Sequence, residues 1–384
     1  MNVILFDLLS TQQSVALGSK FTGGGEYTKT VFRCLVSMAK EANARIIVFY
    51  DFNTFIDEWI IEIIKKENIE AYNINRYSDV LKLDILPSVT TFFQGLIYFS
   101  ANYEMPNNIR TIGVYHGFRT LELPIEKTAY LYSNNTLDVL KNILKYLFNK
   151  MYFKKQYKAQ KKIVDRCDFL IGVSEHSGYS AKMFFPECPE NKIKIFYSPE
   201  KYAPELKNGD NILTKKVILM LGGNRWEKNV YRGAMAIDQL FSNNQLQGYS
   251  VKIVGGLPVR VQKKLHNLDR FELVGYLPAE ELEASYKSCE FFLYPTLNEG
   301  FGYPPLEAMK YGKTCVLSAV TSLPEIYKDS VYYCNPYDIN EIKMRVLQAA
   351  EDKINGEVIK SRYDAIQKRQ NEDLVKLCNL ILEE

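Results

Sequence analysis

Two glutamates separated by glycines and prolines are the residues of this sequence best placed to do chemistry. Glu299 and Glu307 end the segment E-G-F-G-Y-P-P-L-E, which contains Gly300 and Gly302. Apolar residues before the segment predict a buried strand, and helix-forming residues at its end predict a helix. Glycine lets a ligand approach bare backbone, and the first N–H groups of a helix lack partners within it. Two carboxylates at such a bend suit hydrogen bonds from hydroxyl groups, as on a ribose and a sugar ring.

Two cationic side chains follow another predicted strand, residues 217–221. Gly223 lies in the glycine turn after it, and Arg225 and Lys228 come just before a predicted helix. A helix start favours anions and disfavours a lysine, so this arrangement indicates a bound anion such as a phosphate. The alternative is that Lys228 is an ordinary exposed lysine of a first helical turn.

The N-terminal half offers a glycine run and a histidine at predicted strand ends. Gly23, Gly24 and Gly25 lie between the strand at 3–6 and a helix at about 26–40. Neither G-x-G-x-x-G nor G-K-S/T is present, so this is neither a dinucleotide fingerprint nor a P-loop. His116 follows the predicted strand 111–115, where doubly wound sheets bind ligands. The alternatives are a glycine turn without a ligand and a histidine that only packs.

Strands alternate with helices along the whole chain, which predicts an α/β protein with parallel sheets wound on both faces. We expect an N-terminal domain at 1–198, a polar linker at 199–213, a C-terminal domain at 214–359, and a helix at 360–384 that crosses back to the first domain. The expected strands are 3–6, 45–49, 96–99, 111–115, 167–173, 193–197, 217–221, 250–254, 272–274, 289–295, 315–318 and 331–334.

The frame E-G-F-G-x-P-x-x-E-A at 299–308 closely resembles the signature of retaining glycosyltransferases of family 4. The resemblance implies the GT-B fold, with two Rossmann-like doubly wound domains facing each other across a cleft that holds the active site. It also implies that Glu307 binds the ribose and that Glu299 holds hydroxyls of the donor sugar. Backbone N–H groups of Gly300, Phe301 and Gly302 would add to that grip.

The remaining candidate residues take their roles from the same resemblance. Arg225 and Lys228 would contact the donor diphosphate within a loop that contains Gly223, although Arg225 lies closer to Lys228 than the family's usual basic residue does. His116 would contact the donor sugar, but Gly117 stands where the family more often has aspartate. The run Gly23–Gly25 resembles the family's loop that faces the donor phosphates and the acceptor.

The implied activity is transfer of a sugar from a UDP- or GDP-linked donor to an acceptor hydroxyl, with retention at the anomeric carbon and without a metal ion or other cofactor. The acceptor would be a glycan or a lipid-linked saccharide of a surface polysaccharide. The alternatives are a non-catalytic GT-B partner subunit and a GT-B phosphorylase or epimerase. A dinucleotide-dependent dehydrogenase is disfavoured because its fingerprint is missing.

Composition restricts partners and location. A net charge of +3 over 384 residues gives no reason to expect nucleic acid as a partner. The seven cysteines are scattered without a C-x-x-C pair, and no His/Cys cluster has metal-ligand spacing, so reduced thiols and no metal site are expected. The N-terminus does not have the pattern of a signal peptide, and no apolar run is long enough to span a bilayer. We therefore expect a cytoplasmic protein, with contact at the inner face of the membrane.

Residues 137–166 carry nine Lys or Arg against two Asp, interleaved with large apolar residues. A basic amphipathic helix of this kind is compatible with an anionic membrane surface. The alternative is an ordinary helix with one core face and one solvated, lysine-rich face.

Overall fold

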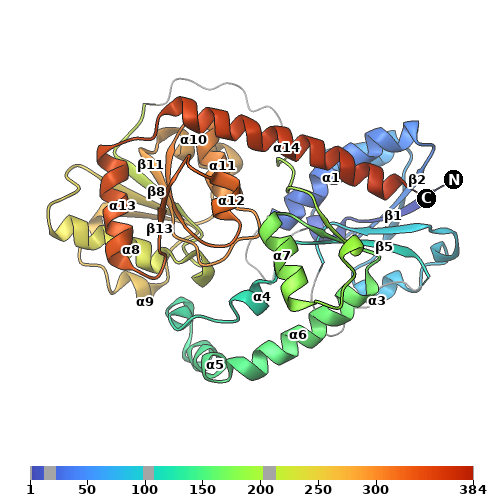
Figure 1. The fold of residues 1–384 in the computed structure, drawn as a ribbon, viewed down its shortest axis with the longest axis horizontal. Helices are drawn as coiled ribbons and strands as arrows, with labels where there is room; N and C mark the ends of the chain where they lie inside the picture. Colours follow the sequence, from blue (N-terminus) through green and yellow to red (C-terminus); the bar gives the residue numbers. More distant parts are fainter. Residues whose placement is uncertain (1, 13–22, 98–107, 202–212, 384) are drawn as a thin grey trace. The chain divides into compact units, whose positions relative to one another are not determined.

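The structure, a computed structural model, describes residues 2–12, 23–97, 108–201 and 213–383, which divide into two compact units (Figure 1). Unit 1 comprises Met1–Phe118, Lys154–Pro204 and Gln367–Glu384, and unit 2 comprises Arg119–Phe153 and Glu205–Ile366. Each unit has its own parallel sheet with helices packed on it.

In the described part of unit 1, seven strands form a parallel sheet in the order β3-β2-β1-β4-β5-β6-β7. The strands are β1 (Val3–Asp7), β2 (Arg45–Tyr50), β3 (Glu70–Asn73), β4 (Thr91–Gln94), β5 (Arg110–Tyr115), β6 (Phe169–Gly172) and β7 (Ile193–Ile195). The helices are α1 (Gly23–Glu41), α2 (Glu58–Lys66), α3 (Tyr77–Val80) and α7 (Glu175–Phe184), with short 3-10 turns η1 (Leu9–Thr11), η3 (Leu86–Ser88) and η5 (Glu190–Lys192). Two longer helices, α6 (Asn149–Arg166) and α14 (Gly356–Leu382), begin in unit 2 and end in unit 1.

Unit 2 has, among its described residues, six parallel strands in the order β10-β9-β8-β11-β12-β13. They are β8 (Val217–Leu221), β9 (Ser250–Val254), β10 (Phe271–Val274), β11 (Phe291–Tyr294), β12 (Thr314–Ser318) and β13 (Tyr332–Cys334). The helices are α4 (Arg119–Glu122), α5 (Thr136–Leu147), α8 (Val230–Ser242), α9 (Val259–Gln262), α10 (Ala279–Ser288), α11 (Tyr303–Lys310), α12 (Leu323–Tyr327) and α13 (Ile339–Glu351), with 3-10 turns η4 (Ala129–Tyr132), η6 (Trp226–Lys228) and η7 (Leu268–Arg270).

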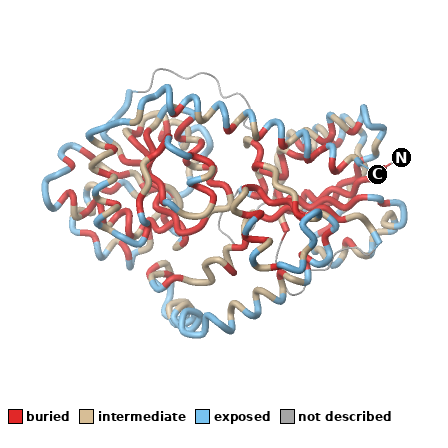
Figure 2. The backbone as a smooth tube through the Cα atoms, in the orientation of Figure 1, coloured by how far each residue is buried: buried red, intermediate tan, exposed pale blue. Residues whose placement is uncertain are grey.

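The central strands are buried on both faces, which explains their nearly uninterrupted apolar sequences. Every residue of β1, β11 and β12 is buried, and Figure 2 shows the strands of both units in red. Such strands fix the sheet firmly, so the loops at their carboxyl ends start from well-defined positions.

The strand order of unit 2 reverses between β8 and β11, which lie side by side. In an open parallel sheet, ligands bind outside the carboxyl ends of the strands at such a reversal. The loop after β8 carries Arg225 and Lys228, and the loop after β11 carries Glu299. The topology therefore brings the predicted cationic and acidic residues to one edge of one sheet.

The segment Arg119–Phe153, which the sequence analysis placed within residues 1–198, groups with unit 2. A buried ion pair between Arg232 and Glu126 (2.8 Å) ties it to α8, and the Tyr132 hydroxyl accepts a hydrogen bond from the Tyr231 N–H (2.9 Å). Leu131 also lies in the apolar core of unit 2. These tertiary contacts leave no signal in the local sequence.

Residues 96 and 97 of the expected strand 96–99 are not in a strand, and the strand in this region is β4. β4 pairs with β1 through Thr91, Phe92 and Phe93, and residues 98–107 lie outside the described part of the chain. The polar ends of the segment T-F-F-Q hide its strand character, although every residue in it is buried. Most of the expected linker, residues 202–212, also lies outside the described residues.

Candidate active site

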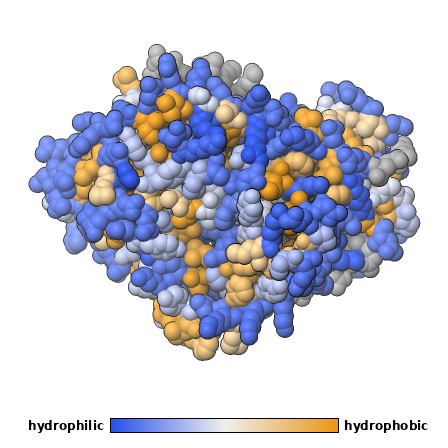
Figure 3. Space-filling view, in the orientation of Figure 1, coloured by the Kyte–Doolittle hydropathy of each residue, from blue (hydrophilic) through white to orange (hydrophobic). Residues whose placement is uncertain are grey.

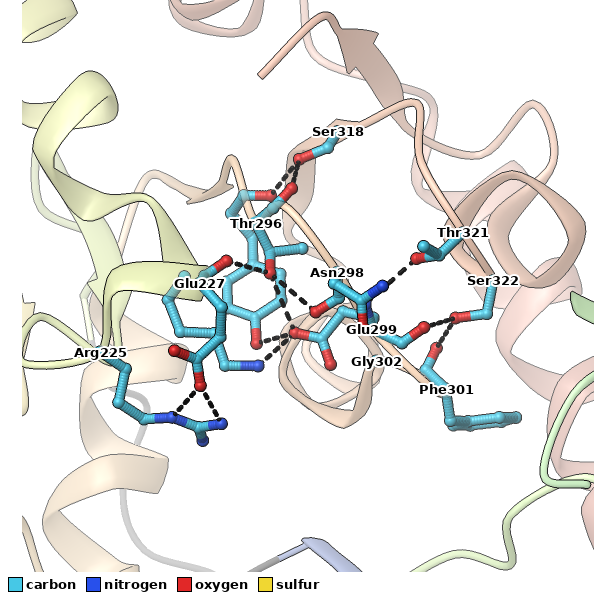
Figure 4. Close-up of polar contacts among 12 residues, drawn as sticks. Arg225, Glu227, Thr296, Asn298, Glu299, Phe301, Gly302, Ser318, Thr321 and Ser322 are labelled. Carbon is cyan, nitrogen blue, oxygen red and sulfur yellow. Dashed lines mark hydrogen bonds and ion pairs between the residues drawn. The ribbon is translucent and has the colours of Figure 1, made fainter. Parts of the chain in front are cut away.

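The carboxylate of Glu299 lies in the loop between β11 and α11, and its Oε1 accepts bonds from three side chains among the described residues (Figure 4). The Tyr294 hydroxyl donates to Oε1 over 2.5 Å, the Thr296 hydroxyl donates over 3.3 Å, and Lys228 Nζ forms an ion pair with it. No described residue hydrogen-bonds to Oε2 of Glu299. One oxygen of this carboxylate is thus held in place by the protein.

The backbone around Glu299 is tied to the chain that follows β12. The Glu299 N–H donates to Thr321 Oγ1 (3.1 Å), and the Ser322 hydroxyl reaches the carbonyls of Glu299 and Phe301, both at 3.2 Å. Gly302 has a φ of +99°, and a Cβ there would lie 2.6 Å from a Leu323 methyl group. Only glycine fits at this position, which explains the second glycine of the frame.

Glu307 lies on α11, where Pro304 and Pro305 occupy the start of the helix as the sequence predicted. The Tyr286 hydroxyl of α10 donates to its Oε2 over 2.9 Å.

A glutamate that the sequence analysis did not select lies between the two cationic residues. Glu227 stands between Arg225 and Lys228 in η6, and Arg225 Nε donates to its carboxylate over 2.8 Å. Burial alone would raise the pKa of Glu227, but the charges of Arg225, Arg119 and Lys228 outweigh it and lower that pKa to about 2. Glu227 is therefore ionised near pH 7. Glu227 lies two residues after Arg225 and one before Lys228, not at the spacing of three or four that predicts a pair on a helix, so no local pattern indicated this contact.

The same turn is fastened directly to the Glu299 loop. The carbonyl of Glu227 accepts bonds from the Thr296 hydroxyl (3.0 Å) and the Leu297 N–H (2.7 Å). Burial and the nearby Arg225 lower the pKa of Lys228, and the Glu299 carboxylate opposes that shift. Arg225, Lys228 and Glu299 are thus brought together as the sequence predicted, with each cation facing a carboxylate.

A buried polar network holds the start of α8 behind Lys228. Asn229 adopts a left-handed conformation with φ of 54°, and its amide donates to the carbonyls of Pro295 (2.9 Å) and Pro336 (2.7 Å). Arg232 donates in turn to the Asn229 side-chain oxygen over 2.9 Å. Since Pro295 begins the loop that carries Glu299, the network fixes the cation and the carboxylate relative to each other.

The glycines of this edge have a packing role as well. A Cβ on Gly223 would lie 1.7 Å from the carbonyl oxygen of Gly256. The backbone of the neighbouring loop therefore leaves no room for a side chain at this position. A ligand-binding role for Gly223 remains a prediction.

Unit 1 holds the other predicted residues at its own sheet edge. His116 Nε2 donates to the carbonyl of Gly95 (3.0 Å), which assigns the proton to that nitrogen, and the ring packs edge-on against Tyr27 at 5.0 Å between centroids. Burial lowers the pKa of His116 to about 4 despite this hydrogen bond, so the imidazole is neutral near pH 7. Its Nδ1 can therefore accept a bond from a hydroxyl group.

Gly23, Gly24 and Gly25 form the first turn of α1 rather than a loop before it, and residues 13–22 lie outside the described part of the chain. A Cβ on Gly24 would lie 2.8 Å from a Leu96 methyl group, so this glycine is required by packing. A role for this turn at the donor phosphates stays a prediction.

Asp7 is a further residue that the sequence analysis did not select. It ends β1, and its carboxylate accepts bonds from the Tyr77 hydroxyl (2.9 Å) and the Leu9 N–H (2.8 Å). Burial raises the pKa of Asp7 to about 7 despite these bonds. A carboxyl group at the end of a central strand that titrates near neutral pH is a candidate functional residue.

The described helices are all too short or too polar to cross a lipid bilayer. Within the same residues, no group of three or more His, Cys, Asp or Glu side chains could hold a metal ion.

Residues 204–371 match the sequence model of a family described as glycosyl transferases group 1. The chain is 42% identical over 89 residues to the serotype-specific mannosyltransferase WbdA of Escherichia coli. The aligned segment covers 22% of this chain and 11% of that protein. It is 40% identical over 89 residues to the Escherichia coli O-antigen chain mannosyltransferase B, covering 23% of each chain. It is 24% identical over 200 residues to the O-antigen chain mannosyltransferase RfbU of Salmonella typhimurium, covering 49% of this chain and 52% of that protein. This chain thus matches between 11% and 52% of the length of these curated relatives.

Solved structures with the same fold cover nearly the whole chain. Sucrose-phosphate synthase from Thermosynechococcus elongatus has a TM-score of 0.67 at 15% identity, with 99% of this chain and 98% of that chain covered. The Anabaena protein HepE in complex with UDP-glucose has a TM-score of 0.64 at 13% identity, with the same coverage. The predicted GT-B type of fold, with two parallel α/β domains, is confirmed. The matched family is described as glycosyl transferases, and the three curated relatives are named as mannosyltransferases.

Proposed function

We propose that the chain is a retaining glycosyltransferase of the family 4 kind, which moves a hexose from a nucleoside-diphosphate sugar to an acceptor hydroxyl. The observation that carries the proposal is the Glu299 carboxylate, because its Oε1 is held by Tyr294, Thr296 and Lys228 while its Oε2 accepts no bond from a described residue. A carboxylate fixed by one oxygen can present the other to sugar hydroxyls without reorganising. This is the preorganisation that favours a transition state over the free substrate.

In the proposed reaction the bond between the anomeric carbon and the diphosphate oxygen breaks, and a bond from the acceptor oxygen forms on the same face. The leaving diphosphate gains negative charge as the bond breaks. Arg225 and Lys228 would stabilise it, because both hold their positive ends beside the Glu299 loop. The acceptor proton would pass to an oxygen of the leaving diphosphate.

Glu307 would bind the ribose hydroxyls through its carboxylate, which the Tyr286 hydroxyl already orients. In unit 1, neutral His116 would accept a bond at Nδ1 from a hydroxyl of the donor sugar. The first turn of α1, with Gly23, Gly24 and Gly25, would face donor phosphates and acceptor. In this proposal protein cations supply the positive charge, so no metal ion is required.

The donor and acceptor follow from what the relatives are named for. Three of them are mannosyltransferases, and two of these are named for the O-antigen chain, which supports mannose as the first donor sugar to try and a surface polysaccharide as the acceptor class. HepE is named as a complex with UDP-glucose, so uridine and guanosine donors both need to be tried. A lipid-linked acceptor would place the reaction at the cytoplasmic face of a membrane.

The test is a panel of UDP- and GDP-linked hexoses with the purified chain, followed by nucleotide release with glycan and lipid-linked acceptors. We expect one donor to release nucleotide in an acceptor-dependent way, and the anomeric configuration of the product by NMR to match that of the donor. Release with inversion would overturn the retaining assignment. Phosphorolysis without any nucleotide would identify a phosphorylase instead, and no turnover with any donor would favour a non-catalytic subunit.

A further inference from the structure

Helix α5 carries a row of leucines that faces away from the protein. Leu137, Leu140, Leu144 and Leu147 follow each other at spacings of three and four residues, which places them on one side of the helix. Their side chains are 70%, 53%, 43% and 66% exposed. Apolar stripes of this kind normally face a core, so an exposed one needs a partner.

The opposite side of α5 is the side that is fastened to unit 2. The Asn142 amide donates to the Ser133 hydroxyl over 2.9 Å, next to η4, and the Asn135 side chain caps the start of the helix through the Asp138 N–H (2.8 Å). No residue of α5 is buried, although all of the helix lies in the described part of the chain. The helix therefore turns the side that carries Asn142 inward and its leucine row outward, whereas the apolar row of an ordinary surface helix faces the core.

The apolar surface continues past the end of α5 and then stops. Phe148 and Met151 are also exposed, whereas Gln160, Ile163 and Val164 later in α6 are buried. We call the exposed set the α5 face, and Figure 3 shows hydrophobic side chains gathered over this helix. It comprises Leu137, Leu140, Ile143, Leu144, Leu147, Phe148 and Met151.

Positive charge borders the α5 face. Lys141, Lys145 and Lys150 are exposed beside it, and the one acidic residue of α5, Asp138, is already paired with Lys141 at 3.4 Å. A second copy of the chain docked on this face would bring like charges together. Acidic lipid headgroups would instead meet lysines whose apolar stems and charged ends suit a membrane interface.

We propose that the α5 face docks on a membrane surface that contains anionic lipid. The leucine row would enter the boundary between headgroups and acyl chains, while the lysines stay at the phosphates. The docking element is therefore 137–151, narrower than the basic segment 137–166. The inference rests on the proposed function only for its purpose, which is to hold the enzyme near a lipid-linked acceptor, and the contact itself needs no sugar nucleotide.

The test is co-sedimentation of the full chain with vesicles of phosphatidylcholine alone and with vesicles that contain about one third phosphatidylglycerol, because anionic lipid attracts polybasic segments. We expect binding to the anionic vesicles that weakens as salt is raised. The double variant Leu140→Gln/Leu144→Gln should lower the partition coefficient about tenfold or more, since it removes apolar area from the interface while keeping good helix formers. Met344→Gln/Val358→Gln, at exposed apolar positions elsewhere in unit 2, is the matched control and should bind as wild type.

Charge is tested with Lys141→Gln/Lys145→Gln against Lys263→Gln/Lys264→Gln, which changes the net charge equally at exposed positions outside the face. Only the first pair should reduce binding. Failure of wild-type chain to bind, or equal binding by the leucine variant, would overturn the proposal. So would a dimer in sedimentation velocity that the leucine variant dissociates, because the face would then be a contact between copies. None of these results bears on the turnover assay, so failure of the docking proposal is distinguishable from failure of the proposed function.

Discussion

Lys228 and Glu299 form an ion pair in which each side chain is only 11% exposed. The pair joins the turn after β8 to the loop after β11, at the point where the strand order of unit 2 reverses. Because the charges of Lys228 and Glu299 neutralise each other, neither charge is left unpaired in this mostly buried position.

Lys228→Ala should lower turnover by about two orders of magnitude, the scale seen when a donor to a developing charge is removed. It should also lower the melting temperature, because it leaves the partly buried Glu299 without its counter-ion. The rate of nucleotide release from the donor that the wild-type chain uses measures the first effect, and thermal unfolding measures the second. Lys310→Ala, at an exposed lysine on α11, is the control. Wild-type rates in the Lys228 variant would dismiss its proposed phosphate role.

Glu307→Ala should weaken nucleotide binding by about 1–3 kcal/mol, the scale of lost hydrogen bonds from a charged acceptor. Calorimetric titration with UDP and GDP measures the loss. Tyr286→Phe is the matched control, since it removes the hydroxyl that donates to Glu307 and leaves the carboxylate in place. An affinity that does not change in the glutamate variant contradicts the ribose role.

Tyr294→Phe removes one donor from Glu299 Oε1 but keeps the aromatic ring, which lies 5.4 Å from Lys228 Nζ. We expect kcat to fall about fivefold with little change in donor KM, because a single hydrogen bond worth about 1 kcal/mol positions the carboxylate without contacting the substrate. Steady-state kinetics separate the two constants. If KM rises and kcat is unchanged, Tyr294 only shapes the binding site.

Asp7 makes stability depend on pH. Its pKa rises from an ordinary 3.8 to about 7 on folding, so the folded state prefers the protonated carboxyl. That preference stabilises the fold fully below about pH 4 and is lost as pH rises through 7. Asp7→Asn should therefore be more stable than wild type at pH 8, with the difference shrinking toward pH 5. Urea unfolding at both pH values measures this, and an equal difference at both would show that Asp7 titrates normally.

Chelation provides a further check on the chemistry. If Arg225 and Lys228 supply the positive charge that the leaving diphosphate needs, EDTA should leave turnover unchanged within about twofold. The control is a metal-dependent enzyme assayed in the same buffer. Activity that disappears with EDTA and returns with added Mg²⁺ or Mn²⁺ would show that the proposed cations are insufficient.

Much of the architecture was readable from the sequence, because buried parallel strands are uninterrupted apolar runs and their caps are local. The Ser174 side chain caps the start of α7, and the Asp338 side chain caps the start of α13, each by bonding an N–H two or three residues further on. The E-G-F-G-x-P-x-x-E-A frame likewise forms a strand, a glycine bend and a helix starting at prolines.

The parts that could not be predicted depend on contacts between distant residues. Nothing local shows that Tyr294 and Lys228 meet at one oxygen of Glu299, or that Glu227 neutralises Arg225. The 119–153 segment joins unit 2 through the buried Arg232–Glu126 pair, whose members are far apart in the chain. The spacing of apolar residues predicts an apolar stripe on α5, but only the structure shows that this stripe faces solvent.

The central claim is that the bend between Glu299 and Glu307 takes a nucleoside-diphosphate sugar. A crystal structure of the chain with UDP or GDP tests it most directly. The account predicts ribose hydroxyls within hydrogen-bond distance of Glu307 and phosphate oxygens within that distance of Arg225 and Lys228. It also predicts that Lys228 Nζ moves away from Glu299 to reach the phosphate. A nucleotide bound elsewhere, with that bend empty, would contradict it.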